Sequence, residues 1–345
     1  MKSCEASPRA GWACAEVEID PMDSQEIIEP FARMLNAAVG PAEVREAERS
    51  NSLGAIWDSL SSSGYLDALI AEDRGGAGFG LADVFPLLAL VGAKGVPAPV
   101  GETMIARALA AEAGITLSDG PIALATGQVD GQVVTCARVA QQILYDNGAE
   151  LVLLAAADCS LRATGIEFSL AARADLSRIR GQILPRPAGG LLSIAAILRS
   201  ILIAGAANQL VEQSTVFANE RVQFGKPIGR QQSLQHNLAV MAENAIAARI
   251  AAQLGAAGGL APSLAAAATA KSVSSRAAAL IANSAHALHG AIGISEEYDL
   301  QLLTRRLHEW RMADGSEGYW SGLLGASRLS CPATSVDWVR AEIFA

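Results

Sequence analysis

The chain has 345 residues, long enough to bury a large core and to form two or three domains. It is 51% hydrophobic and rich in alanine, with only 5% aromatic residues, which predicts a mainly helical protein with a smaller β part. The formal net charge is −9 and basic residues are nowhere concentrated, which excludes nucleic acid and anionic membrane surfaces as main partners.

The N-terminus and the cysteines indicate a cytoplasmic protein. The first ten residues carry charged side chains and no apolar core of a signal peptide, so residues 1–22 are interpreted as a disordered leader. The cysteines are odd in number and lack CxxC spacing, which is typical of reduced thiols and not of a disulfide framework or zinc site. They are Cys4, Cys14, Cys136, Cys159 and Cys331.

Residues 23–118 predict an N-terminal helical domain. Asp23 and Glu26 have the spacing of a capping box at the start of a first helix, which the Gly40-Pro41 pair ends. The glycine-rich stretch 74–80 lacks G-x-G-x-x-G spacing and follows no strand, so it is interpreted as a turn. Further helices are expected around 53–60, at 81–93 and at 102–113.

Residues 119–190 predict a small middle β domain, and residues 191–345 predict a C-terminal helical domain. Apolar runs separated by Gly, Asp and Asn indicate strands at 121–125, 132–139, 150–156 and 164–170. Helices are expected at 191–220, about 231–256, 262–288, 296–310 and 316–328. Helices, then strands, then helices make an α+β protein in three parts.

The segment 191–207 is almost wholly apolar, but Arg199 lies in its middle. A membrane-spanning helix needs about 20 apolar residues and tolerates a central arginine poorly. We therefore expect a buried helix of a soluble protein and no membrane span.

Three motifs, in order along the chain, resemble the acyl-CoA dehydrogenase family. They are GYL at 64–66 with GGAG at 75–78, NERVQFGKPI at 219–228 with QQ at 231–232, and LHGAIG at 288–293 with EYDL at 297–300 and RR at 305–306. The resemblance implies an N-terminal helical domain, a middle β domain and a C-terminal four-helix bundle. It also implies α,β-dehydrogenation of an acyl-CoA, in which a base takes the α-proton and FAD takes the β-hydride, with an electron-transfer flavoprotein or similar acceptor as a partner.

The resemblance also implies cofactor-binding residues. Arg221 matches the arginine that reaches the FAD pyrophosphate across the dimer interface, a contact that suits a guanidinium. The alternative is a surface ion pair with Glu220 or Glu212. The other positions that match cofactor contacts are Phe224, Gln232, Gly290 and Gly293, where the glycines let backbone approach the adenosine half.

Arg199 matches a buried arginine near the family's substrate pocket, although a salt bridge that only satisfies its charge is an equal alternative. His286 and His289 have helical spacing, but no third ligand is evident, so no metal site is expected.

The chain departs from the family pattern in the middle domain and at the base. No tryptophan occurs between Trp57 and Trp310, and the family's T-E-P-x-x-G-S-D turn is not recognisable, so the middle domain is short and lacks flavin-covering elements. Alignment on the glycine after the usual glutamate base places Asp314 at that position, and Leu198 fills the alternative base position. An aspartate is one methylene shorter, and such a displacement can cost much of the rate.

This combination of losses resembles the shorter subunit of heteromeric acyl-CoA dehydrogenases of bacterial steroid, aromatic or dicarboxylate catabolism. A second dehydrogenase-type subunit is then the expected partner. Three alternatives stay open at this point: a self-sufficient homomeric enzyme that uses Asp314, a flavin oxidase or monooxygenase, and a non-catalytic scaffold with the same fold. In the heteromeric interpretation Asp314 is vestigial and caps the helix that begins around Ser316.

Overall fold

The computed structural model describes residues 21–127, 130–223 and 225–344. Most of the predicted leader and the cofactor candidate Phe224 therefore lie outside the described residues. The first helix, α1 (Pro21–Ala38), begins at Pro21, so the leader boundary at 22 and the predicted cap at Asp23 fall inside this helix.

Helices dominate the chain up to residue 112. They are α1, α2 (Pro41–Ser50), α3 (Ala55–Ser61), α4 (Phe85–Ala93) and α5 (Val100–Glu112), with short 3-10 turns η1 (Tyr65–Asp67) and η2 (Glu72–Arg74). Helix α2 was not predicted, because its sequence is mostly polar and it buries few side chains. The pair Gly40-Pro41 ends one helix and also starts the next, since the Glu43 carboxylate accepts a hydrogen bond from the Gly40 amide at 3.0 Å.

Two small sheets follow. The first has the strand order β1-β3-β4-β7, with β1 (Ile122–Ala125) parallel to β3 (Gln142–Asp146), and β4 (Leu151–Ala155) and β7 (Gln182–Leu184) antiparallel. The second has the order β2-β6-β5, formed by β2 (Gln132–Val134), β6 (Ala172–Asp175) and β5 (Ser160–Ala163).

The predicted strand at 164–170 is wrong. The chain turns there between β5 and β6, where Gly165 and Phe168 have φ values of 86° and 60°. Residues in a β-strand have negative φ values, so these left-handed backbone angles show that the apolar run forms a loop. Ile166 in this loop is 68% exposed.

The C-terminal part is a helical bundle around α6 (Gly190–Glu220), which packs against α7 (Gln232–Ala256), α8 (Leu264–His289) and α9 (Leu300–Met312). Helix α10 (Glu317–Ser330) packs on α8, and α11 (Ser335–Glu342) follows it. Short 3-10 turns, η4 (Ile228–Arg230) and η5 (Gly290–Ile294), precede α7 and follow α8. Gly190–Glu220 and Leu264–Ile294 are long and apolar enough to cross a membrane, but 94% of the apolar window of the first is buried within the protein. The segment 191–207 is therefore a core helix.

Helices α4 and α6 touch through their backbones. A Cβ on Gly92 would lie 2.2 Å from the Leu202 carbonyl oxygen, and a Cβ on Gly205 would lie 1.8 Å from that of Ala89. Only glycine permits this approach. The contact holds the N-terminal helices on the bundle.

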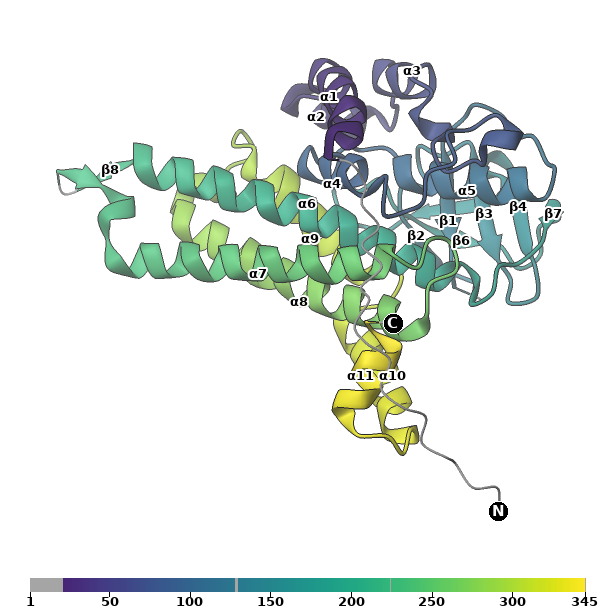
Figure 1. Cartoon of the computed structure of the whole chain (residues 1–345). Helices are drawn as coiled ribbons and strands as arrows, with labels where there is room; N and C mark the ends of the chain where they lie inside the picture. Colours follow the sequence, from purple (N-terminus) through teal and green to yellow (C-terminus); the bar gives the residue numbers. More distant parts are fainter. Residues whose placement is uncertain (1–20, 128–129, 224, 345) are drawn as a thin grey trace.

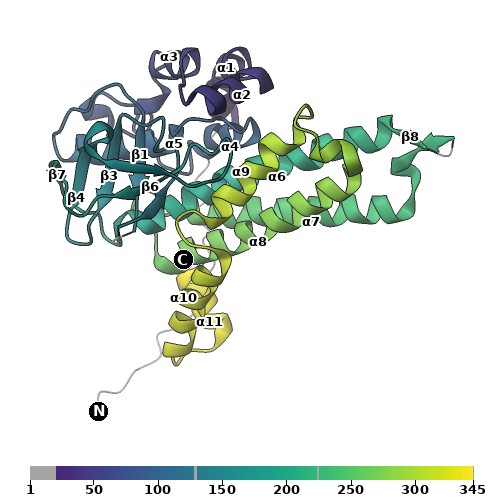
Figure 2. The ribbon, with the colours of Figure 1, turned by 180° about the vertical axis from the view of Figure 1, so that it is seen from behind.

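Figures 1 and 2 show the bundle as an elongated body with the sheets at one end. The hairpin of β8 (Val222–Gln223) and β9 (Lys226–Pro227) forms the opposite tip in both views. The mainly helical α+β fold with a small β part is confirmed. The division into domains at 118/119 and 190/191 stays a prediction.

Candidate functional site

Asp314 lies in a strained turn between α9 and α10. Its φ is 55° and that of Gly315 is 95°, so two consecutive residues have left-handed backbones. Such a conformation costs a non-glycine residue roughly 1–3 kcal/mol and persists only where surrounding contacts fix it. One of these contacts is the indole Nε1 of buried Trp320, which donates to the Asp314 carbonyl oxygen at 2.8 Å.

The carboxylate of Asp314 has a hydrogen-bond partner on each oxygen. Oδ2 accepts from the Nε of Arg199 at 2.9 Å, and Oδ1 accepts from the hydroxyl of Thr126 at 2.8 Å. Its side chain is only 8% exposed. The predicted alternative that Asp314 caps α10 is wrong, because Ser316 is the N-cap and its side chain accepts from the Tyr319 amide.

Arg199 joins the three parts of the chain. Besides Asp314, its guanidinium donates to the carboxylate of Glu102 in α5 and to the hydroxyl of Thr135 after β2. Arg199 and Glu102 have side chains 1% and 3% exposed. Burial alone would lower the pKa of Arg199, but the two carboxylates raise it above its ordinary value. Arg199 therefore stays charged and forms the expected salt bridges, while its role near a substrate pocket stays a prediction.

A second buried cation lies behind the Asp314 turn. Lys271 in α8 is fully buried, and its Nζ lies 2.8–2.9 Å from four acceptors, the carbonyl oxygens of Trp310, Arg311 and Gly315 and the hydroxyl of Ser275. Its three N–H donors are shared among these acceptors. Burial lowers its pKa to about 7, and the attraction of Asp314 opposes that change. The sequence analysis did not single out Lys271.

A pocket of about 470 Å³ opens at the Asp314 turn, within the size range of small-molecule sites. Its lining combines the end of β1, strand β2, the start of α6 and the turn, and Arg199 is absent from it because this side chain lies behind Asp314. The lining residues are Thr126, Gly127, Gln132, Val133, Leu192, Asp314, Gly315 and Tyr319.

Two polar groups at this pocket are paired with each other. The Gln132 side chain accepts from the Gly127 amide at 2.8 Å and donates to the Gly127 carbonyl oxygen. The hydrogen bonds of these groups are therefore satisfied within the protein. The loss of flavin-covering elements from the middle part stays a prediction.

The predicted cofactor residues that can be described lie at the other end of the bundle. Arg221 ends α6 and is exposed, with its guanidinium carbon 5.7 Å from the Phe217 ring centroid. The Phe217 ring stacks on His289 at 4.2 Å, which connects the ends of α6 and α8. The alternative ion pair of Arg221 with Glu220 or Glu212 is not found among the described residues.

Gln232 and Gly290 lie on the same end and are exposed, at the start of α7 and the end of α8. Gly290 has a φ of 62°, and open space surrounds the position of its absent Cβ. Gly293 is buried, and a Cβ there would lie 2.9 Å from the Cβ of His289. Packing within the chain therefore accounts for Gly293, whereas the backbone at Gly290 is open to a ligand or partner.

The two groups of candidate residues cannot meet within one chain. Arg199 and Arg221 are 22 residues apart (221 − 199), one within α6 and the other at its end. At 1.5 Å per residue this separates their backbones by roughly 33 Å. Asp314 binds Arg199, so the structure brings Asp314 and Arg199 together and keeps Arg221, Gln232 and Gly290 apart from them.

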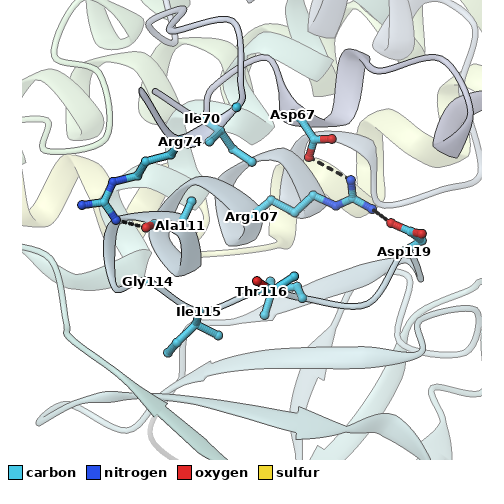
Figure 3. A pocket seen from close by; sticks show the side chains of 11 residues that line it. Asp67, Ile70, Arg74, Arg107, Ala111, Gly114, Ile115, Thr116 and Asp119 are labelled. Carbon is cyan, nitrogen blue, oxygen red and sulfur yellow. Dashed lines mark hydrogen bonds and ion pairs between the residues drawn. The ribbon is translucent and has the colours of Figure 1, made fainter. Parts of the chain in front are cut away.

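A different pocket, of about 430 Å³, lies between η1, η2 and the end of α5 (Figure 3). Arg107 crosses it and pairs with Asp67 at 2.8 Å and Asp119 at 3.3 Å. The Arg74 guanidinium donates to the carbonyl oxygen of Ala111. Because each arginine is already engaged by the protein, this pocket is interpreted as a structural cleft.

Comparison with known proteins decides the family. The profile described as "Acyl-CoA dehydrogenase, C-terminal domain" matches residues 188–327. The chain is 30% identical over 299 residues to the acyl-CoA dehydrogenase IpdE2 of Mycobacterium tuberculosis, covering 84% of this chain and 92% of that protein. The chain belongs to the acyl-CoA dehydrogenase family. The IpdE2 protein of Mycolicibacterium smegmatis is also 30% identical, over 293 residues, covering 81% of this chain and 90% of that protein.

Solved structures of acyl-CoA dehydrogenases share the fold. A chain of the ChsE4–ChsE5 complex of Mycobacterium tuberculosis superposes with a TM-score of 0.71 at 20% identity, covering 90% of this chain and 98% of that one. A chain of the Tcur3481–Tcur3483 steroid ACAD gives a TM-score of 0.76 at 22% identity, covering 88% of this chain and 97% of that one.

The end of the bundle that carries Arg221, Gln232 and Gly290 is called the far end below. In this acyl-CoA dehydrogenase it fits an anionic dinucleotide such as FAD. Arg221 presents an exposed guanidinium with no carboxylate partner among the described residues, and Gly290 presents open backbone. When bound, FAD supplies the acceptor for a hydride. The chain's own part would be to neutralise phosphate charge with Arg221 and to let the cofactor approach at Gly290.

The buried centre around Arg199 and Asp314 is called the near end below. The sequence analysis does not identify the partners of these two residues there: Glu102, Thr126, Thr135 and Lys271. None lies in a recognisable motif. A buried arginine and a buried aspartate each require partners, so Arg199 and Asp314 were signals that such partners exist. Which residues supply them depends on the tertiary structure.

Proposed function

We propose that this chain is the subunit of a heteromeric acyl-CoA dehydrogenase that completes its partner's FAD site, while the partner supplies the catalytic base. The reaction is α,β-dehydrogenation of an acyl-CoA: a proton leaves Cα to the base, and a hydride leaves Cβ to FAD. The observation that carries the proposal is the state of Asp314, the chain's candidate base.

Asp314 is poorly suited to take a proton from carbon. Both of its oxygens already accept hydrogen bonds, and one is paired with the buried, permanently charged Arg199. Turning the carboxylate toward a substrate would break both bonds and separate it from the buried guanidinium of Arg199. A general base needs a free lone pair within reach of the substrate proton, and Leu198 at the alternative position has none.

The far end supports the other half of the proposal. Arg221, Gln232 and Gly290 are exposed, and Arg221 lies roughly 33 Å along α6 from Arg199, the partner of Asp314, so this end of the bundle is remote from the chain's own turn. They suit a cofactor held mainly by a neighbouring subunit.

The other ligands follow from the same proposal. The substrate is an acyl-CoA thioester, and a steroid-derived acyl group is the first to test because a solved fold neighbour is described as a steroid ACAD. The electrons pass from the flavin to an electron-transfer flavoprotein or similar acceptor. We also propose that the complex is cytoplasmic.

The test is the flavin content and reactivity of the chain alone and of the chain co-expressed with a second acyl-CoA dehydrogenase-type subunit. We expect the chain alone to retain little FAD and the complex to be yellow and to bleach with acyl-CoA without oxygen. Asp314→Asn in the complex should leave bleaching and FAD content nearly unchanged, like the exposed control Asp337→Asn. A yellow homo-oligomer with about one FAD per chain, or loss of bleaching in Asp314→Asn with FAD retained, would refute the proposal.

A further inference from the structure

The buried centre around Asp314 contains four charged groups. Arg199 and Lys271 are cations, and Glu102 and Asp314 are anions. With Lys271 protonated, the charges of these four groups sum to zero. A buried charge without compensation is costly, so each cation in such a centre stabilises the buried anions or polar groups that it contacts.

Lys271 contacts the backbone on both sides of the Asp314 turn. The carbonyl oxygens of Trp310 and Arg311 belong to the last turn of α9, where no intrahelical amide follows to bind them, and Gly315 comes directly after Asp314. One ammonium group thus links the end of α9 to the residue after Asp314. A positive charge is also favourable at the negative end of a helix dipole.

We propose that Lys271 is the positioning residue of the Asp314 turn: its ammonium group holds the left-handed backbone of Asp314 and Gly315 and so aims the Asp314 carboxylate at Arg199 and Thr126. Lys271 itself touches neither of these side chains in any hydrogen bond among the described residues. It acts through the turn, and through the turn it shapes one wall of the 470 Å³ pocket, which Asp314 and Gly315 line. This inference concerns the chain's own architecture and holds whichever subunit supplies the base.

The structure contains a reporter for the turn and one for a distant site. The Trp320 indole donates to the Asp314 carbonyl oxygen at 2.8 Å, and the Trp57 indole donates to the Asp119 carbonyl oxygen at 3.0 Å in the N-terminal part. Their indole N–H resonances in ¹⁵N-labelled full-length protein can be assigned with Trp320→Phe and Trp57→Phe. We expect Lys271→Met to move the Trp320 resonance and leave that of Trp57 in place.

The control is Ser275→Ala, which removes one contact of Lys271 but leaves its three carbonyl contacts. This variant should leave both resonances in place. An unmoved Trp320 resonance in folded Lys271→Met would overturn the proposal.

A double-mutant cycle separates positioning from mere filling of the core. Each single variant, Lys271→Met or Asp314→Asn, should raise the unfolding equilibrium constant by some factor. If Lys271 acts through Asp314, the factor for the double variant should be at least tenfold smaller than the product of the two single factors. Independent effects that multiply within a factor of two would overturn the proposal. Should Lys271→Met fail to fold, Lys271→Leu, which also lacks a donor, is judged by the same resonance and the same cycle.

Discussion

Replacing Arg199 with methionine should be among the most destabilising single changes in this protein. Arg199 is 1% exposed and donates to the carboxylates of Glu102 and Asp314 and to the Thr135 hydroxyl. Its removal leaves two buried negative charges, one from α5 and one from the α9–α10 turn, without their cation. Breaking a buried ion pair from one side typically costs about 3–5 kcal/mol, and here two anions lose the same partner.

The assay is urea unfolding followed by tryptophan fluorescence, with Arg199→Met compared with the double variant Arg199→Met, Glu102→Gln. The double variant removes one cation and one anion and leaves Lys271 to compensate Asp314, so it should recover about 1–3 kcal/mol of the loss. If Arg199→Met costs less than about 1 kcal/mol, or if the double variant is no more stable than the single one, the buried charges do not stabilise the junction as argued.

Two further predictions concern the far end and Lys271. Arg221→Ala should weaken FAD binding by the assembled complex by about 2–4 kcal/mol without loss of assembly. The control Arg249→Ala, on the exposed surface of α7, should leave FAD binding unchanged. The measurement is the FAD content of each variant complex after gel filtration, and equal FAD content in the two variants would contradict the prediction. The pKa of Lys271 is lowered to about 7 in the folded chain from 10.5, so between these pH values the unfolded chain binds more protons and stability must rise with pH. Relative to Lys271→Met, the wild-type free energy of unfolding should rise by up to about 1.4 kcal/mol per pH unit in that window; a flat difference would contradict the direction of the shift.

The fold could largely be predicted from the sequence because its strongest signals are long and local. The apolar run of α6, and the alanine-rich stretches of α7 and α8, agree with the expected helices to within a few residues. Short elements were less predictable. The sequence analysis predicts neither helix α2 nor strands β3, β5, β6 and β7, and it predicts a strand where the chain forms a loop near Phe168. A few apolar residues look alike in a strand and in a loop, so short runs carry little information.

The candidate site was only half predictable. The far-end residues Arg221, Gln232 and Gly290 belong to contiguous motifs, which sequence comparison finds readily. The near end depends on contacts between distant parts of the chain: Arg199 and Glu102 are 97 residues apart, and Asp314 and Thr126 are 188 apart. No spacing rule predicts such pairs. The predicted capping role of Asp314 is therefore wrong, although its position just before the helix that begins around Ser316 is confirmed.

The distance between the two ends has a consequence for the kind of assembly. In the proposed complex, each cofactor site combines the near end of one subunit with the far end of another. In a homo-oligomer of this chain, every site would pair an intact far end with a near end whose carboxylate is bound by Arg199 and whose strand groups bind each other. With a different partner, the far end of this chain meets a near end that it does not have to supply. The proposed heteromeric complex is the arrangement in which an exposed Arg221 is useful and an engaged Asp314 is harmless, because the two residues then serve different sites.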